Sequence, residues 1–326
     1  MGNQKPHVHL LTTGGTIANP HYVDGYITGE TLIEDIPEIT DVADVTVSNV
    51  SSVGSSTLGP EIWFDLHAEI MAVAESDDPP DGFVVTQGSN SIEETGYFLS
   101  LTLDTEIPVA MAAAQRNHGL IGNDGDRNLL DAVKVATSEE ARGRGVLITI
   151  NDEIHSARDV SKIVSGRPDA WSSVNLGVLG LIDKRDNMKF YRETECRHYP
   201  DTEFDISEAD ASEFPSIEIV YAFHNSTPEL VEAAGEIADG LVVAGFPTGS
   251  PKSEVDKRDQ REAIEDLVDE EFPVVMTHRG VEGWPYPNES YIWGNTLRPQ
   301  KAAILLALGL METSDIAEID RMFHEY

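Results

Sequence analysis

Short apolar runs alternate with longer amphipathic segments along most of the chain. The apolar runs predict strands at residues 7–12, 45–50, 82–86, 107–112, 145–150, 188–192, 216–222, 240–245 and 272–277. Helical periodicity predicts helices at 61–75, 91–100, 126–140, 227–238, 254–270, 298–309 and 315–325. Nearly continuous apolar strands separated by amphipathic helices are typical of a parallel sheet covered on both faces. The pattern therefore predicts an α/β fold with a doubly wound, mostly parallel sheet.

This alternation breaks near residues 194–215, where acids, prolines and small polar residues replace the apolar runs. Such a composition indicates a linker. We therefore expect a larger N-terminal α/β catalytic domain at 1–194, a linker at 195–214 and a smaller C-terminal α/β domain at 215–326. A chain of 326 residues with 40% hydrophobic residues is long enough to bury two cores.

The charge balance is strongly acidic, with 22 Lys and Arg against 58 Asp and Glu and a net charge of −36. Such a surface repels nucleic-acid backbones and anionic lipids, so neither is an expected partner. In concentrated salt the screening length falls to about 3 Å at 1 M, which removes most of the self-repulsion. The composition predicts a halophilic protein with an acidic surface. It indicates the salt conditions to which the protein is adapted and does not indicate which reaction it catalyses.

Cysteine use and the apolar runs bear on the compartment. Cys196 is the only cysteine, which excludes an internal disulfide and argues against a cysteine-ligated metal. The first residues, MGNQKPHVHLL, lack the pattern of a secretory signal, and the apolar run at 302–311 is too short to span a bilayer. We expect a cytoplasmic protein.

Three polar segments follow predicted strands, where ligands collect in parallel sheets. The first, LLTTGGTIAN at 10–19, has a Gly-Gly turn, which is common in any strand-to-helix connection. The second, VVTQGSNSIEET at 84–95, contains two overlapping capping boxes, Ser91 with Glu94 and Asn90 with Glu93, which would explain only part of its polar cluster. The third, at 148–163, carries Lys162, which is either a solvated surface group or, if partly buried, a base.

Four segments in this order resemble the bacterial and archaeal L-asparaginase family. They are TTGGTIA near the start, VVTQGSNSIEETGYFLSL, DGDRNLLDAV at 124–133 and NDEIHSARDVSK, and the C-terminal segment 297–326 is similar too. The resemblance covers nearly the whole chain. It implies an amidohydrolase of linear amides that needs neither metal nor organic cofactor, and the small-molecule partner it implies is an amide.

Carried over residue by residue, the family's nucleophilic threonine falls on Thr13 and its loop tyrosine on Tyr26. The proton relay falls on Ser89 and Lys162. The substrate contacts that the resemblance implies in this domain fall on Gly14, Ser55, Ser56, Gly88 and Asn90.

The chemistry requires these residue types for separate reasons. A threonine hydroxyl needs a proton acceptor, which Tyr26 or a deprotonated Lys162 can provide. Backbone N–H groups of the Gly-Gly turn and of the Ser89 region can stabilise the negative charge on the carbonyl oxygen. After ammonia leaves, water activated through Ser89 and Lys162 would hydrolyse the acyl-threonine ester.

The sequence departs from the family at three positions of the second segment. Ser89 replaces a threonine and keeps its hydroxyl, and Gln87 replaces a histidine with a smaller expected effect. Asn90 replaces an aspartate that faces the substrate's α-ammonium group and accompanies the lysine. The amide keeps one acceptor oxygen but removes the charge and adds N–H donors.

Three functions therefore remain open. The first is hydrolysis of L-asparagine or a close small amide, and the second is hydrolysis of a small or cyclic amide that lacks an α-ammonium group. The third is ligand binding without catalysis on an asparaginase fold, against which the joint presence of Thr13, Tyr26, Ser89 and Lys162 argues.

The resemblance also implies a homo-oligomer, a dimer or more usually a homotetramer, in which a neighbouring subunit's smaller domain completes the pocket. Ser250 and Glu282 are the expected contributors from that domain. Trp284, Tyr286 and Tyr291 are expected to pack at the subunit interface. Asp124 and Glu282 are candidates for a carboxylate that compensates for Asn90 near Lys162.

Overall fold

The computed structural model describes residues 5–21, 24–286 and 290–326. By its internal contacts the chain divides into two units, Met1–Ala211 and Ser212–Tyr326. Each unit is built on its own sheet.

The N-terminal unit is built on an eight-stranded sheet in the order β10-β9-β6-β5-β4-β3-β1-β2. Five neighbouring strands, β2, β1, β3, β4 and β5, are parallel, whereas β6, β9 and β10 pair antiparallel at one end. The strand bounds are β1 His7–Gly14, β2 Asp44–Val53, β3 Gly82–Thr86, β4 Val109–Ala112, β5 Val146–Ile150, β6 Glu153–Ser156, β9 Gly180–Ile182 and β10 Met188–Phe190. The predicted mostly parallel α/β fold is confirmed.

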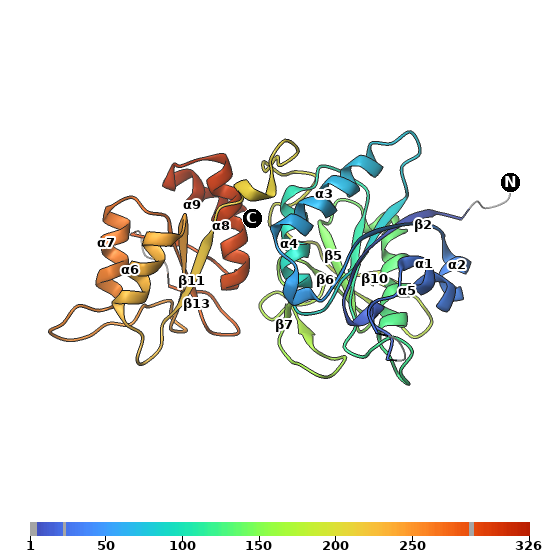
Figure 1. Ribbon diagram of the computed structural model, residues 1–326, viewed down its shortest axis with the longest axis horizontal. Helices are drawn as coiled ribbons and strands as arrows, with labels where there is room; N and C mark the ends of the chain where they lie inside the picture. The colour runs from blue at the N-terminus through green and yellow to red at the C-terminus, as the bar shows by residue number, and fades with distance from the viewer. Residues whose placement is uncertain (1–4, 22–23, 287–289) are drawn as a thin grey trace. The chain divides into compact units, whose positions relative to one another are not determined.

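Helices cover both faces of this sheet (Figure 1). On one face, α1 (Gly29–Asp35), α2 (Pro37–Val42) and α5 (Gly125–Ala136) pack on a core of small and branched side chains from β1, β3, β4 and β5. On the other face lie α3 (Pro60–Ala74) and α4 (Ile92–Thr102), and Gly96 of α4 rests against Met111, Ile148 and Ala157. Burial on both faces explains why these strands read as continuous apolar runs.

The C-terminal unit is also a parallel sheet covered by helices on both faces, but it is smaller. Its sheet has the order β11-β12-β13-β14, all parallel, with β11 Ile217–Tyr221, β12 Gly240–Gly245, β13 Val274–His278 and β14 Ile292–Trp293. Helices α6 (Pro228–Ile237) and α7 (Gln260–Asp269) pack on one face, and α8 (Pro299–Glu312) covers the other with α9 (Ile316–Glu325) beside it (Figure 1).

The segment between the two sheets carries little regular structure. Residues 191–216 contain one 3-10 turn, Ala211–Glu213. Part of the segment packs on the N-terminal sheet, because the buried Tyr199 hydroxyl accepts a hydrogen bond from Val109 N at 3.1 Å.

The longer elements lie close to their predicted positions, and the errors have local causes. The helix expected from residue 254 begins only at Gln260, because the Asp259 side chain caps it by accepting from Glu262 N at 2.9 Å. Helices α1 and α2 and the short hairpin of β7 (Ser161–Lys162) and β8 (Trp171–Ser172) were not predicted. Elements this short contain too few residues to show a period.

The parallel register places two chain segments together at the carboxyl edge of the N-terminal sheet. Thr12 of β1 pairs with Thr86 of β3, and the register of β1 shifts between Thr12 and Gly14. Thr13 therefore lies where β1 leaves the regular ladder, next to the end of β3.

Candidate active site

Thr13 lies at the carboxyl end of β1, and its side chain is completely buried. Its hydroxyl donates a hydrogen bond to the carbonyl oxygen of Thr86 at 3.1 Å. This bond directs the hydroxyl proton at a backbone carbonyl, which is not a general base, so the proton has to pass to another acceptor when the oxygen attacks.

The loops after β1, β2 and β3 meet beside Thr13 through glycines. Gly15 has φ +80°, and a Cβ there would lie 2.2 Å from Gly88 Cα. A Cβ on Gly88 would in turn lie 2.7 Å from Ser55 Oγ. Side chains at these two glycines would force the loops apart, so their absence permits the close approach.

The Gly-Gly turn is less open as an oxyanion site than its sequence suggests. The Gly15 N–H donates to Val53 O at 3.0 Å, which commits it to the neighbouring strand. The expectation that the whole turn offers N–H groups to a ligand is therefore wrong for Gly15.

The cap that the sequence suggested for the Ser91 side chain is absent. Ser91 is the N-cap residue of α4, but its side chain makes no capping bond. Its hydroxyl instead donates to Ser55 O at 2.9 Å and accepts from Gln87 Nε2 at 3.2 Å. A backbone carbonyl from a neighbouring loop has replaced the local partner.

Further hydrogen bonds to Ser55 and Thr95 hold the other residues of the turn that follows β3. Asn90 N donates to Ser55 Oγ at 3.2 Å, and Gln87 Nε2 also donates to Thr95 Oγ1 at 2.9 Å. Thr95 accepts in addition from Trp63 Nε1 at 2.9 Å. The roles of Trp63 and Thr95 were missed from the sequence, since both lie inside predicted helices and read as core residues there.

Lys162 reaches this turn from the β7–β8 hairpin. Its Nζ donates to Ser89 Oγ at 2.7 Å and to Asn90 Oδ1 at 3.1 Å. Ser89 is buried, Lys162 half-buried and Asn90 exposed. Burial lowers the pKa of Lys162, and the negative charge of Glu93 opposes that shift. The structure thus brings three of the predicted site residues, Ser89, Asn90 and Lys162, into direct contact.

Tyr26 and Ser56 lie near the Ser89–Asn90–Lys162 cluster but are not part of its hydrogen bonds. Tyr26 is half-buried on the N-terminal core, and a Cβ on Gly54 would lie 3.4 Å from its hydroxyl, which places it beside the Ser55 loop. The hydrogen bonds of the described residues do not join Tyr26 to Thr13. Ser56 is exposed.

The Asp124 side chain binds backbone amides at the start of α5. Its carboxylate accepts from Gln115 N and Arg116 N, each at 2.9 Å, at the start of α5. The expectation that Asp124 compensates for Asn90 near Lys162 therefore has no support, because these amides already bind its oxygens.

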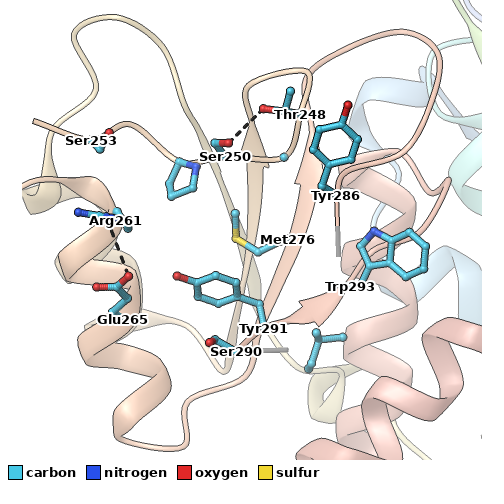
Figure 2. A pocket seen from close by; sticks show the side chains of 13 residues that line it. Thr248, Ser250, Ser253, Arg261, Glu265, Met276, Tyr286, Ser290, Tyr291 and Trp293 are labelled. Atoms are coloured by element: carbon cyan, nitrogen blue, oxygen red, sulfur yellow. Dashed lines mark hydrogen bonds and ion pairs between the residues drawn. The ribbon is translucent and has the colours of Figure 1, made fainter. Parts of the chain in front are cut away.

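The two site residues expected from the C-terminal unit, Ser250 and Glu282, are exposed there. Ser250 lines a cavity of about 810 Å³, and its hydroxyl lies 3.0 Å from Thr248 Oγ1 (Figure 2). Tyr286, Tyr291 and Trp293 line the same cavity, with an Arg261–Glu265 ion pair at 4.0 Å (Figure 2). Trp284 is exposed.

The described residues hold neither a candidate metal site nor a candidate membrane-spanning helix. Among residues 5–21, 24–286 and 290–326, no group of three or more His, Cys, Asp or Glu side chains is placed to hold a metal ion. Within the same part of the chain, no helix has the length and apolarity needed to cross a membrane.

The protein belongs to the class of two-unit α/β proteins, and Thr13, Ser89 and Lys162 lie among the polar residues at the carboxyl edge of its N-terminal sheet. Residues 7–196 match the family "Asparaginase, N-terminal", and residues 216–323 match "Glutaminase/Asparaginase C-terminal domain". The chain therefore belongs to the asparaginase family of amidohydrolases.

The sequences of individual relatives align with this chain over most of their length. L-asparaginase 2 of Bacillus subtilis is 36% identical, over 98% of this chain and 87% of that protein. L-asparaginase 2 of Escherichia coli is 32% identical, over 98% of this chain and 93% of that protein. The crystal structure of a probable cytoplasmic L-asparaginase from Campylobacter jejuni is 34% identical with a TM-score of 0.90, and the match covers 99% of this chain and 100% of that one.

The glycine contact makes a prediction that can be tested by unfolding. Gly15→Ala should destabilise the protein by a positive-φ cost of about 1–2 kcal/mol plus a packing cost of about 1–3 kcal/mol. Gly25→Ala is the matched control, because Gly25 also has positive φ (+99°) but nothing lies within 4 Å of its Cβ position. Denaturant unfolding should show a clearly larger loss for Gly15→Ala. Equal losses would mean that the Gly15–Gly88 approach contributes nothing.

Proposed function

We propose that this chain hydrolyses the side-chain amide of L-asparagine, or of a close small amide, to the acid and ammonia, with Thr13 as nucleophile. One observation carries the proposal. The half-buried Lys162 donates to Ser89 Oγ at 2.7 Å, in a turn whose Gly88 meets the loop of Thr13. The names of the relatives from Bacillus subtilis and Escherichia coli support the substrate class.

The first half of the reaction forms an ester. Thr13 Oγ attacks the amide carbon, and its proton passes to a base, for which Tyr26 and neutral Lys162 are the candidates. The backbone amides of Gly88 and Ser89 are the candidates for stabilising the oxygen that becomes negative. The C–N bond then breaks, and the nitrogen leaves as ammonia with a proton returned from the base.

The second half removes the acyl group. A water molecule gives its proton through Ser89 to neutral Lys162 and attacks the ester carbon. The C–O bond to Thr13 breaks, Thr13 Oγ takes the proton back, and the acid product leaves. A lowered pKa at Lys162 favours this step, since more of the amine is then neutral near pH 7.

Thr13→Ala tests the nucleophile. We expect ammonia release from asparagine, measured in several-molar potassium chloride, to fall by about a thousandfold or more, because no hydroxyl remains to form the ester. Thr16→Ala is the control, as Thr16 is the same residue type in the same loop and is half-buried.

Two results would contradict this role. Retained hydrolysis in Thr13→Ala would remove Thr13 as nucleophile. If the unaltered protein hydrolyses no amide in a panel that includes asparagine and glutamine, and Thr13→Ala binds ligand unchanged, the chain is a binding protein.

Asn90 favours a second candidate substrate, an amide without an α-ammonium group. A lysine ammonium can only donate, so the Asn90 oxygen must face Lys162 Nζ. The group left to face the opposite side is the Asn90 NH₂, which is a donor and cannot accept from a second ammonium. This orientation suits a substrate that offers an acceptor oxygen at that point.

Asn90→Asp distinguishes the two substrates. A hydrogen bond to a charged group contributes about 1.5–3 kcal/mol against about 1 kcal/mol for a neutral one. We expect kcat/KM for asparagine to rise about tenfold relative to that for its deamino analogue, the same amide without the amino group. If both rise equally or both fall, the charge at position 90 does not select the substrate.

The remaining features are assigned from the resemblance. We infer a homo-oligomer, a dimer or tetramer, in which Ser250 and Glu282 of a partner subunit contact the substrate. We also infer action in the cytoplasm, because the Campylobacter jejuni protein is named as cytoplasmic, although a Haemophilus influenzae relative is named as periplasmic. The free thiol of Cys196 is consistent with a reducing compartment.

The net charge of −36 leads us to infer a halophilic protein, and salt titration tests it. Raising potassium chloride from 0.1 M shortens the screening length from about 10 Å to about 3 Å at 1 M. The melting temperature should therefore rise by several degrees or more between 0.1 and 3 M potassium chloride. A non-ionic osmolyte that gives the same osmolality is the control for exclusion effects. A melting temperature that is flat or falls with potassium chloride would contradict the inference.

A further inference from the structure

The ammonium of Lys162 is bound only by neutral acceptors among its hydrogen bonds on the described residues. These are the Ser89 hydroxyl and the Asn90 amide oxygen. A half-buried ammonium is costly without a compensating negative charge. Lys162 stays charged in this position only if a residue outside this pair supplies a negative charge.

Glu93 is placed to supply that charge. It lies in the first turn of α4, three residues after Asn90, and its side chain is only 5% exposed. Because Ser89 and Asn90 immediately precede Ser91, the N-cap residue of α4, their bonds to Nζ hold Lys162 near the N-terminus of this helix. A carboxylate is also favoured there, since the helix dipole is positive at that end.

We propose that Glu93 replaces the missing carboxylate of position 90 and acts as a positioning residue, whose negative charge holds the Lys162 ammonium against Ser89 and Asn90. The role of Lys162 in hydrolysis rests on the function proposed above. The electrostatic relation between Glu93 and Lys162 does not depend on it.

The charge balance around Lys162 agrees with this assignment. Burial lowers the pKa of Lys162, and Glu93 raises it. Other charged groups on the flanking segments are paired with each other, Arg158 with Asp159 at 3.0 Å and Arg167 with Asp169 at 3.4 Å. Glu93 thus keeps Lys162 charged and anchored at a pH at which burial alone would favour loss of its proton.

Glu93→Gln tests the proposal through Lys162 itself. The purified protein is treated with acetic anhydride across a pH series, and acetylation of the peptide that contains Lys162 is measured by mass spectrometry. We expect the midpoint of labelling to move down by about half a pH unit or more, because the opposing charge is gone. The low-pH limb of kcat should move in the same direction, whereas a purely structural loss would lower kcat equally at every pH.

Three further variants sharpen the result. Glu94→Gln removes the same charge from the next residue in the same helical turn and should leave the labelling midpoint unchanged. Glu93→Asp keeps the charge on a shorter side chain and should give a midpoint between those of the unaltered protein and Glu93→Gln. Adding Asn90→Asp to Glu93→Gln should bring the midpoint back up, since Asn90 Oδ1 lies 3.1 Å from Nζ.

The outcomes separate this proposal from the proposed function. An unchanged Lys162 midpoint in folded Glu93→Gln, or equal shifts in Glu93→Gln and Glu94→Gln, would overturn the role of Glu93. If Glu93→Gln does not fold, an unchanged midpoint in Glu93→Asp would overturn it as well. Absence of amide hydrolysis in every variant, together with the expected shift in labelling, would overturn the hydrolase and leave the Glu93–Lys162 relation standing.

Discussion

The close approach of two backbones, at Gly15 and Gly88, is the constraint on which the site depends. A Cβ on Gly15 would lie 2.2 Å from Gly88 Cα, so neither loop could keep its position with a larger residue there. The parallel register of β1 and β3 brings the two loops to the same edge of the sheet. Thr13 and the Ser89–Asn90 turn thereby become neighbours, although they are about 75 residues apart in the chain.

The pKa of Lys162 is the second property on which a proton relay at this edge of the sheet depends. Lys162 comes from a short hairpin outside the main sheet and is tied to the turn by two hydrogen bonds. Burial lowers its pKa, which favours the neutral amine that a proton relay needs, and Glu93 limits that shift. Asn90 accepts from the same lysine through its amide oxygen, which leaves its NH₂ turned away from Nζ, and under the proposed function this NH₂ selects the substrate.

The sequence predicted the sheet well because its strands are buried on both faces. The runs at 82–86 and 240–245 coincide with β3 and β12, whose side chains are completely buried. Local rules failed where tertiary contacts compete with them, as at Ser91, whose hydroxyl bonds to Ser55 O and not to its own helix. The contact between Lys162 and Ser89 joins residues 73 positions apart, and only resemblance to a family suggested that pairing from the sequence.

Hydrolysis through an acyl ester on Thr13 can be tested by a rapid-quench experiment. The protein is mixed with excess asparagine in concentrated potassium chloride, quenched in acid within milliseconds and digested for mass spectrometry. We expect the peptide containing Thr13 to gain the mass of one aspartyl group, and the gain to disappear once the substrate is exhausted. Steady release of ammonia with the acyl group on another residue would contradict it.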